Sequence, residues 1–83
     1  MILDVKRNRL IKNIELTPQE TDILKSLCTG DLIDYEEILK YTKISSIEAL
    51  RSSITRLKDK TGLNIETRKN MGLILRDILF IDY

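Results

Sequence analysis

The stretch SSIEALRSSITRLKDKTGLNIETRKNMGLIL, residues 45–75, decides the fold of this 83-residue chain. In its first half, apolar residues recur at the spacing of one helix face, as Ile47, Leu50, Ile54 and Leu57. After Gly62 the spacing changes to the pattern that is typical of strands. The stretch therefore predicts a long helix over residues 46–60, followed by a β-hairpin over residues 64–75.

Specific residues predict where these two elements begin, turn and end. Ser45 and Glu48 have the spacing of a capping box, so Ser45 is the expected N-cap of the helix. Gly62 is its expected C-terminal stop, because glycine readily adopts the left-handed conformation that ends helices. Asn70 and Gly72 are the hairpin residues best able to adopt a positive φ, so we expect the turn there.

Two shorter helices are expected before the long one. The segment TPQE at 17–20 combines a capping box with proline at the first helical position, and Gly30 is expected to end the helix that follows. Asp34 and Glu37 predict a second capping box, which opens a helix that ends near Thr42. The core expected from all three helices consists of Ile23, Leu24, Leu27, Ile38, Leu39, Leu50, Ile54 and Leu57.

Short strands are expected outside the helices. A small antiparallel sheet with tight turns is predicted at the N-terminal end, over residues 2–5, 9–11 and 14–16. Residues 32–33 predict a brief extended pair, and residues 78–81 predict either a further strand or a packed tail. No internal repeat or linker is present, so we expect a single α+β domain over residues 1–83.

The composition is that of a soluble globular chain, with 42% hydrophobic and 33% charged residues. Ile and Leu contribute 26 residues, so the core is expected to be almost entirely aliphatic. No apolar run approaches the roughly 18 residues that span a bilayer, and no signal peptide follows Met1. The expectation is a cytoplasmic protein without a membrane partner.

This chain lacks the residue types that most catalytic and metal sites require. It has no His and therefore offers no imidazole base or ligand. The single Cys28 excludes an internal disulfide and a thiolate zinc site, and it is expected to pack as a small buried hydrophobe. Glycine-rich phosphate-binding loops are absent. The sequence contains no convincing pair of carboxylates for a hydrolase that would use carboxylates alone as acid and base. We therefore expect a binding protein rather than an enzyme, with no cofactor and no metal.

The net charge of +1 hides an uneven distribution of charged residues. Residues 14–42 sum to −5 and residues 43–76 sum to +5, while residues 1–13 carry +3 and residues 77–83 carry −2. An anionic partner is therefore expected to meet residues 43–76. Ordinary solvated surface charge is the alternative explanation.

The polar side of the long helix carries residue types that suit the DNA major groove. Short side chains permit a close approach, and arginine can make paired hydrogen bonds to guanine. Arg56 follows Ile54 by about 200° around the helix, so it is expected to point outward. Its alternative roles are a phosphate contact or an ion pair with Asp59, and the alternative for the whole helix is a basic face that merely meets solvent.

Three segments of the chain resemble, in order, the effector domains of OmpR/PhoB-type response regulators. LTPQETDIL at 16–24 is similar to the family pattern L-T-P-x-E-x-x-L-L, and ITRLKDKTG at 54–62 is similar to I-x-R-L-R-x-K-L-G. IETRKNMGLIL at 65–75 is similar to I-x-T-V-R-G-x-G-Y-x-L. The resemblance implies a winged helix-turn-helix with hairpin 64–75 as the wing. It also implies a DNA-binding transcription regulator of a bacterial two-component system.

By position, the resemblance implies a role for each polar residue. Arg56 takes the place of the base-reading arginine, with Ser52 and Ser53 beside it in the major groove. Phosphate contacts are implied for Thr55 and Lys58. Arg68 and Lys69 belong to the wing, which in this family approaches the adjacent minor groove. The expected DNA-binding residues are Arg51, Ser52, Ser53, Thr55, Arg56, Lys58, Arg68 and Lys69.

Further partners follow from the same resemblance. Members of the family usually bind direct repeats of double-stranded DNA as head-to-tail homodimers, under control of a phosphorylated receiver domain that precedes the effector domain. The connection that contacts RNA polymerase in the family is shorter here, around residues 43–45. The alternative function is a winged helix that docks a protein partner through its third helix or its C-terminal tail, without contacting DNA.

Overall fold

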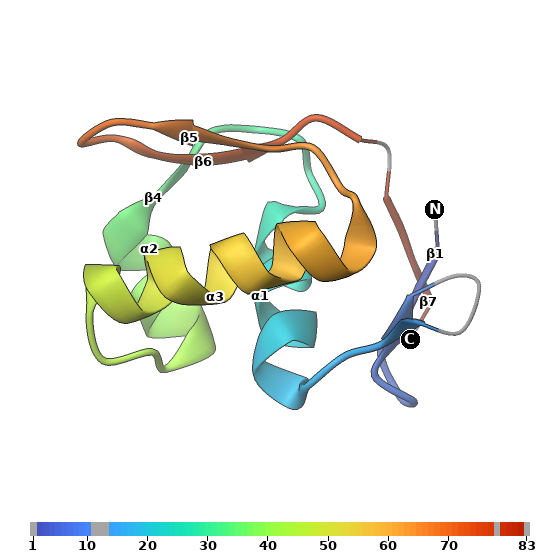
Figure 1. Cartoon of the computed structure of the whole chain (residues 1–83). Coiled ribbons are helices and arrows are strands. Elements are labelled where there is room, and N and C mark those ends of the chain that lie inside the picture. Colours follow the sequence, from blue (N-terminus) through green and yellow to red (C-terminus); the bar gives the residue numbers. More distant parts are fainter. Residues whose placement is uncertain (1, 11–13, 78, 83) are drawn as a thin grey trace.

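The computed structural model describes residues 2–10, 14–77 and 79–82. Within these residues the chain forms three helices and two β-sheets, which confirms the expected α+β class (Figure 1). Ile11 and Ile78, which belong to expected strands, lie outside the described residues. In chain order the elements are β1 (Ile2–Asp4), β2 (Arg9–Leu10), β3 (Ile14–Glu15), α1 (Pro18–Leu27), β4 (Ile33–Asp34), α2 (Tyr35–Thr42), α3 (Ile47–Thr61), β5 (Ile65–Arg68), β6 (Gly72–Leu75) and β7 (Phe80–Asp82).

The first sheet joins the two ends of the described chain. Its strand order is β3-β2-β1-β7, and the predicted antiparallel pairing of β1 with β2 and of β2 with β3 is confirmed. The C-terminal segment forms a strand rather than a packed tail, since β7 lies parallel to β1 with Ile2 opposite Phe80. The Val5 N–H extends this pairing by donating to the Asp82 carbonyl at 3.0 Å.

Capping side chains start α1 and α2 close to the predicted residues. The capping box of α1 is confirmed: the Glu20 N–H donates to Thr17 Oγ1 at 3.1 Å, and the Thr17 N–H donates to Glu20 Oε1 at 2.8 Å. Asp34 caps α2 as predicted, but its Oδ1 accepts from the Glu36 N–H at 2.8 Å, and no reciprocal bond to Glu37 accompanies it in the described residues.

The long helix α3 begins one residue later than predicted. Ser46 is the N-cap, because its extended backbone lets Oγ accept from the Ala49 N–H at 3.1 Å, so the predicted box of Ser45 with Glu48 is wrong. Gly62 ends the helix as predicted, with φ of 71° and its N–H donating to the Lys58 carbonyl at 2.8 Å.

The second sheet has the order β4-β6-β5, and its β5–β6 hairpin confirms the predicted one. Asn70 in the turn has a φ of 62°, as predicted. Gly72 does not share that role, because it lies in β6 without a positive φ. It is instead packed against β4, where a Cβ at this position would lie 1.9 Å from the Ile33 carbonyl oxygen.

The core lies between the three helices and the two sheets. Of the predicted core residues, Leu39 is half-buried and packs against the core, and all the others are buried. Cys28 is also half-buried against it, and Ile47, at the first position of α3, is 38% exposed. Aliphatic residues from the strands and connections complete the core, namely Leu3, Leu10, Leu16, Ile44, Leu63, Ile65, Leu73, Leu75 and Leu79, together with Tyr35.

Candidate functional site

One side of α3 is exposed along the whole helix. Leu50, Ile54 and Leu57 bury the opposite side, so the polar residues between them project from the protein. In Figure 1, α3 crosses the molecule beneath the β5–β6 hairpin, with α1 and α2 behind it. The exposed polar residues of α3 are Glu48, Arg51, Ser52, Thr55, Arg56, Lys58, Asp59 and Lys60.

Ser53 does not belong to this exposed side, which corrects its expected place in the groove. It is only 5% exposed. The reason is visible in the spacing, since Ser53 follows Leu50 by three residues and precedes Leu57 by four. Residues at these spacings share one face of a helix, so Ser53 turns inward with the core residues.

Arg56 is exposed, as its angle from Ile54 predicts. Its Nη2 donates to Ser53 Oγ at 3.4 Å, a long contact to a neutral group. The alternative ion pair with Asp59 is not among those that the described residues form. Arg56 and the exposed Ser52 are therefore both available to an external partner.

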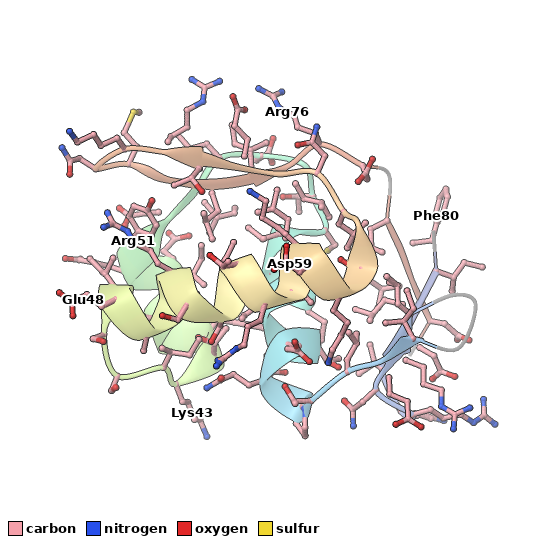
Figure 2. All side chains as sticks on the ribbon, in the orientation of Figure 1. Lys43, Glu48, Arg51, Asp59, Arg76 and Phe80 are labelled. Atoms are coloured by element: carbon pink, nitrogen blue, oxygen red, sulfur yellow. The ribbon has the colours of Figure 1, made fainter. Side chains whose placement is uncertain are left out.

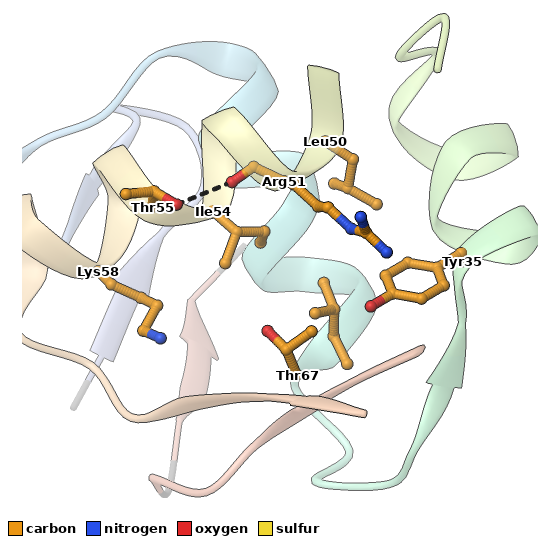
Figure 3. Close-up of a pocket in the computed structure, with 8 residues that line it drawn as sticks. Tyr35, Leu50, Arg51, Ile54, Thr55, Lys58 and Thr67 are labelled. Atoms are coloured by element: carbon orange, nitrogen blue, oxygen red, sulfur yellow. Dashed lines mark hydrogen bonds between the residues drawn. The ribbon is translucent and has the colours of Figure 1, made fainter. Parts of the chain in front are cut away.

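A cavity of about 220 Å³ opens between α3 and the hairpin, and we call it the helix–hairpin cleft (Figure 3). Its base is apolar and consists of Leu50, Ile54 and Leu73. Its polar walls come from three elements: α2 contributes Tyr35, β5 contributes Thr67, and α3 contributes Arg51, Thr55 and Lys58.

Short-range contacts order the walls of the helix–hairpin cleft. The Arg51 guanidinium lies over the Tyr35 ring, 5.9 Å from its centroid. The Tyr35 hydroxyl donates to the Arg68 carbonyl at 3.4 Å and so links α2 to the hairpin. The Thr55 hydroxyl donates to the Arg51 carbonyl at 3.1 Å, as the dashed line in Figure 3 marks. Three of the expected binding residues, Arg51, Thr55 and Lys58, are thus brought together.

Tyr35 and Thr67 belong to this cleft but were not among the expected binding residues. The strand period offers a signal for Thr67, since it lies two residues after the buried Ile65 and therefore faces the same side of β5. Tyr35 follows the helix cap Asp34, and only the packing of α2 against α3 and the hairpin places its ring beside Arg51.

The hairpin separates its two expected binding residues from the cleft. Arg68 shares the other face of β5 with Glu66, and the two form an ion pair at 3.5 Å. Arg76 joins them, with Nη2 2.6 Å from Glu66 Oε2, and Figure 2 shows Arg76 on the side of the hairpin away from α3. The hydrogen bond from Arg76 is the main cause of the lowered pKa of Glu66. Lys69 is exposed in the hairpin turn.

An ion pair between an exposed lysine and a buried glutamate holds the C-terminal part of α3 against α1. The Lys60 ammonium donates to Glu20 Oε1 at 2.7 Å. Burial of Glu20 opposes its ionisation, but the Lys60 ammonium and the hydrogen bonds with Thr17 outweigh this effect, so the pKa of Glu20 is lowered. The ionised carboxylate therefore helps to orient α3 relative to the rest of the fold.

The described residues form neither a metal site nor a membrane-spanning helix. No three Cys, Asp or Glu side chains within 2–10, 14–77 and 79–82 gather as a metal site would require. None of the helices in this part of the chain has the length and apolar character of a membrane span. Comparison with protein-family models, with curated proteins and with solved structures found no match to this chain.

Proposed function

We propose that this chain binds double-stranded DNA as a winged helix-turn-helix of the OmpR/PhoB type and regulates transcription. In this proposal α3 enters the major groove and the β5–β6 hairpin is the wing. The observation that carries the proposal is the exposed polar side of α3, which combines the short side chains of Ser52 and Thr55 with the long cations Arg51, Arg56 and Lys58. A 15-residue helix is long enough to follow the groove over several base pairs.

Within this surface, we assign base reading to Arg56 and positioning on the backbone to the cations beside it. Arg56 has no carboxylate partner among the described ion pairs, so its guanidinium is available to guanine. Ser52 precedes it by one helical turn, and its small side chain lets the helix approach the bases. Glu48 and Asp59 share the exposed side, where a carboxylate can accept a hydrogen bond from cytosine.

The charge distribution supports the same orientation. Residues 43–76, which include α3 and the hairpin, carry a net charge of +5. A phosphate backbone is drawn to such a region. The proposal also implies the partners of the family: a second copy on direct repeats, a receiver domain and RNA polymerase.

Selection of bound sequences from a random duplex library tests the proposal directly. We expect the wild type to enrich a defined sequence, and we expect Arg56→Ala to weaken binding to that sequence by about 1–3 kcal/mol with a much smaller effect on random DNA. Arg9→Ala on the N-terminal sheet removes the same charge from a strand outside α3 and the hairpin, and it is the matched control. It is expected to bind the selected sequence like the wild type.

The possible results separate the roles of Arg56. Equal losses on selected and random DNA would make Arg56 a phosphate contact. If the Arg56→Ala variant binds the selected sequence with the affinity of the wild type, residues on another side of α3 must contact the bases. Absence of any binding by the wild type, at low salt as well, would overturn the proposed function.

One observation favours a protein-binding function as the second candidate. Ile2 and Phe80 lie opposite each other in the β1–β7 pair and are 45% and 64% exposed. Figure 2 shows Phe80 projecting from the N-terminal sheet, apart from α3 and the hairpin. Neighbouring exposed apolar side chains are the starting point of the contiguous apolar patches that mark interaction surfaces. If Phe80→Ser abolishes a cellular phenotype while DNA binding is unchanged, this surface has a function of its own.

A further inference from the structure

We infer that the helix–hairpin cleft binds one phosphate group between Arg51, Lys58 and Thr67. The inference rests on the proposed function when the phosphate belongs to the DNA backbone. A free phosphate would present the same chemistry to the cleft, and the experiment below distinguishes the two sources.

The cations of α3 and the hairpin differ in whether they form ion pairs within the fold. Lys60 of α3 pairs with Glu20, and Arg68 of β5 and Arg76, which follows β6, both pair with Glu66. No carboxylate of the described residues lies within ion-pair distance of Arg51 or Lys58. Two cations of one cavity are thus left for an external anion, while their neighbours are neutralised within the fold.

The side chains of Arg51 and Lys58 converge on one cavity from different turns of α3. Arg51 and Lys58 are seven residues apart on α3, which corresponds to two turns and about 10.5 Å along the helix axis. Both nevertheless line the same cavity of about 220 Å³. Figure 3 shows the guanidinium of Arg51 entering it beside Tyr35 and the ammonium of Lys58 entering it from the other end. Their donors can therefore approach one group held between them.

The two threonine hydroxyls of the cleft differ in whether they are free to donate a hydrogen bond to a ligand. The Thr55 hydroxyl already donates to the Arg51 carbonyl at 3.1 Å, so its proton is engaged within α3. The exposed Thr67 on β5 forms no such bond among the described hydrogen bonds, and Figure 3 shows it in the cleft opposite α3. An ionised phosphate oxygen only accepts hydrogen bonds, so Thr67, and not Thr55, is the hydroxyl that is free to donate to it.

The rest of the cleft favours a held anion. Its base of Leu50, Ile54 and Leu73 is apolar and buried, which lowers the local dielectric constant and strengthens each charge-assisted hydrogen bond. The contact of Tyr35 with the Arg68 carbonyl ties the hairpin to α2 and so holds the two walls in place. If α3 occupies a major groove and the hairpin the next minor groove, the cleft between them faces the phosphates of the strand in between.

A scan with methylphosphonate tests this inference. In each duplex of the selected sequence, one backbone phosphate is replaced by the uncharged methylphosphonate, and affinity is measured for the wild type and for Lys58→Gln, Arg51→Gln and Thr67→Val. We expect one position at which the wild type loses about tenfold, the size of one charge-assisted hydrogen bond. At that position each variant is expected to lose little further, because the contact is already missing.

Two variants serve as controls for the scan. Thr55→Val removes the hydroxyl whose proton is engaged within α3. Whatever its overall affinity for DNA, this variant is expected to lose as much affinity as the wild type when the identified phosphate is replaced. Lys6→Gln removes one charge from the exposed β1–β2 turn and is expected to keep the wild-type sensitivity at the identified phosphate. Circular dichroism of each variant verifies that it is folded.

Titration of the wild type and of Lys58→Gln with inorganic phosphate, followed through the amide signal of Thr67, completes the test. DNA binding with no position that couples to Lys58 would overturn the inference and leave the proposed function standing. A Thr67 shift that Lys58→Gln abolishes, without DNA binding by the wild type, would assign the cleft to a free phosphate and overturn the proposed function. No DNA binding and no shift would overturn both.

Discussion

Glycine residues at two positions of this chain serve different physical purposes. Gly62 has a φ of +71° and open space around its Cα, so it is required for the left-handed end of α3. Gly72 has ordinary strand geometry, but a Cβ there would lie 1.9 Å from the Ile33 carbonyl oxygen. The first glycine is required by backbone conformation and the second by the close approach of β4.

Alanine substitutions separate these two requirements. We expect Gly62→Ala to lower the free energy of unfolding by about 1 kcal/mol, the cost of a left-handed alanine. Gly72→Ala is expected to cost about 3 kcal/mol, because a backbone atom of Ile33, unlike a side chain, cannot rotate away. Chemical denaturation of both variants measures the difference. A smaller loss for Gly72→Ala than for Gly62→Ala would contradict the close packing of β4 against β6.

Helix α3 is held in the fold by its apolar side and by its ion pair with α1. Leu57 on the apolar side is fully buried, whereas Ile47 at the first position of the helix is 38% exposed. Near the other end of α3, Lys60 binds Glu20, whose carboxylate also completes the capping box of α1. The burial of the apolar side and the ionised Glu20 therefore both stabilise the position of α3 in the fold.

Truncation of the apolar side is expected to have an effect that depends on position. Leu57→Ala should lower the free energy of unfolding by about 2–5 kcal/mol, since it opens a cavity in the core. Ile47→Ala is the control on the same helix and should cost less than about 1 kcal/mol, because much of its side chain already meets water. Equal losses in thermal melts of the two variants would show that Ile47 and Leu57 are equally embedded.

The Glu20–Lys60 pair predicts a pH dependence of stability. The folded pKa of Glu20 lies below its ordinary value of 4.5, so the ionised pair stabilises the fold above that pH. This contribution is lost as the pH falls through the folded pKa. Glu20→Gln retains a capping side chain but not the charge, so we expect a loss of about 1 kcal/mol at neutral pH that disappears in acid. A difference between variant and wild type that stays constant across the titration would contradict the role of the charge.

The net charge of the whole molecule changes sign along the chain. Residues 43–76 sum to +5 and include α3 and the hairpin, while residues 14–42 sum to −5 and include β3, α1, β4 and α2. Parallel pairing of β1 with β7 places the described ends of the chain in one sheet, beside the C-terminal part of α3 rather than beside the hairpin turn (Figure 1). The proposed DNA surface is thus left uncovered by the chain termini that the structure describes.

This distribution predicts the salt dependence of DNA affinity. Each phosphate contact that is lost should reduce the slope of log K against log salt by about 1, so Lys58→Gln and Lys69→Gln should each have a shallower slope than the wild type. Lys6→Gln, outside the basic part, should retain the wild-type slope. Fluorescence anisotropy at several salt concentrations measures all four proteins. Identical slopes for Lys6→Gln and Lys58→Gln would contradict a localised DNA surface.

The sequence by itself was sufficient for the elements that short-range interactions determine. The Thr17–Glu20 capping box, the Gly62 stop and the Asn70 turn each depend on residues within a few positions of one another, and the structure contains all three. The apolar side of α3 is equally local, since it follows from the helical period. The outward position of Arg56 follows from that same period.

Only the tertiary structure decided which distant segments meet. The pairing of β7 with β1, the approach of Ile33 to Gly72, and the cleft that joins Tyr35 and Thr67 to α3 all connect residues far apart in the chain. Ser53 is a different case, because its spacing from Leu50 and Leu57 already placed it on the buried face of α3, although its polarity indicated the surface. Helix caps and the helical period depend on interactions between residues that are close in the chain. The β1–β7 pairing, the approach of Ile33 to Gly72 and the cleft depend instead on how whole elements pack against one another, which the local spacing of residues does not determine.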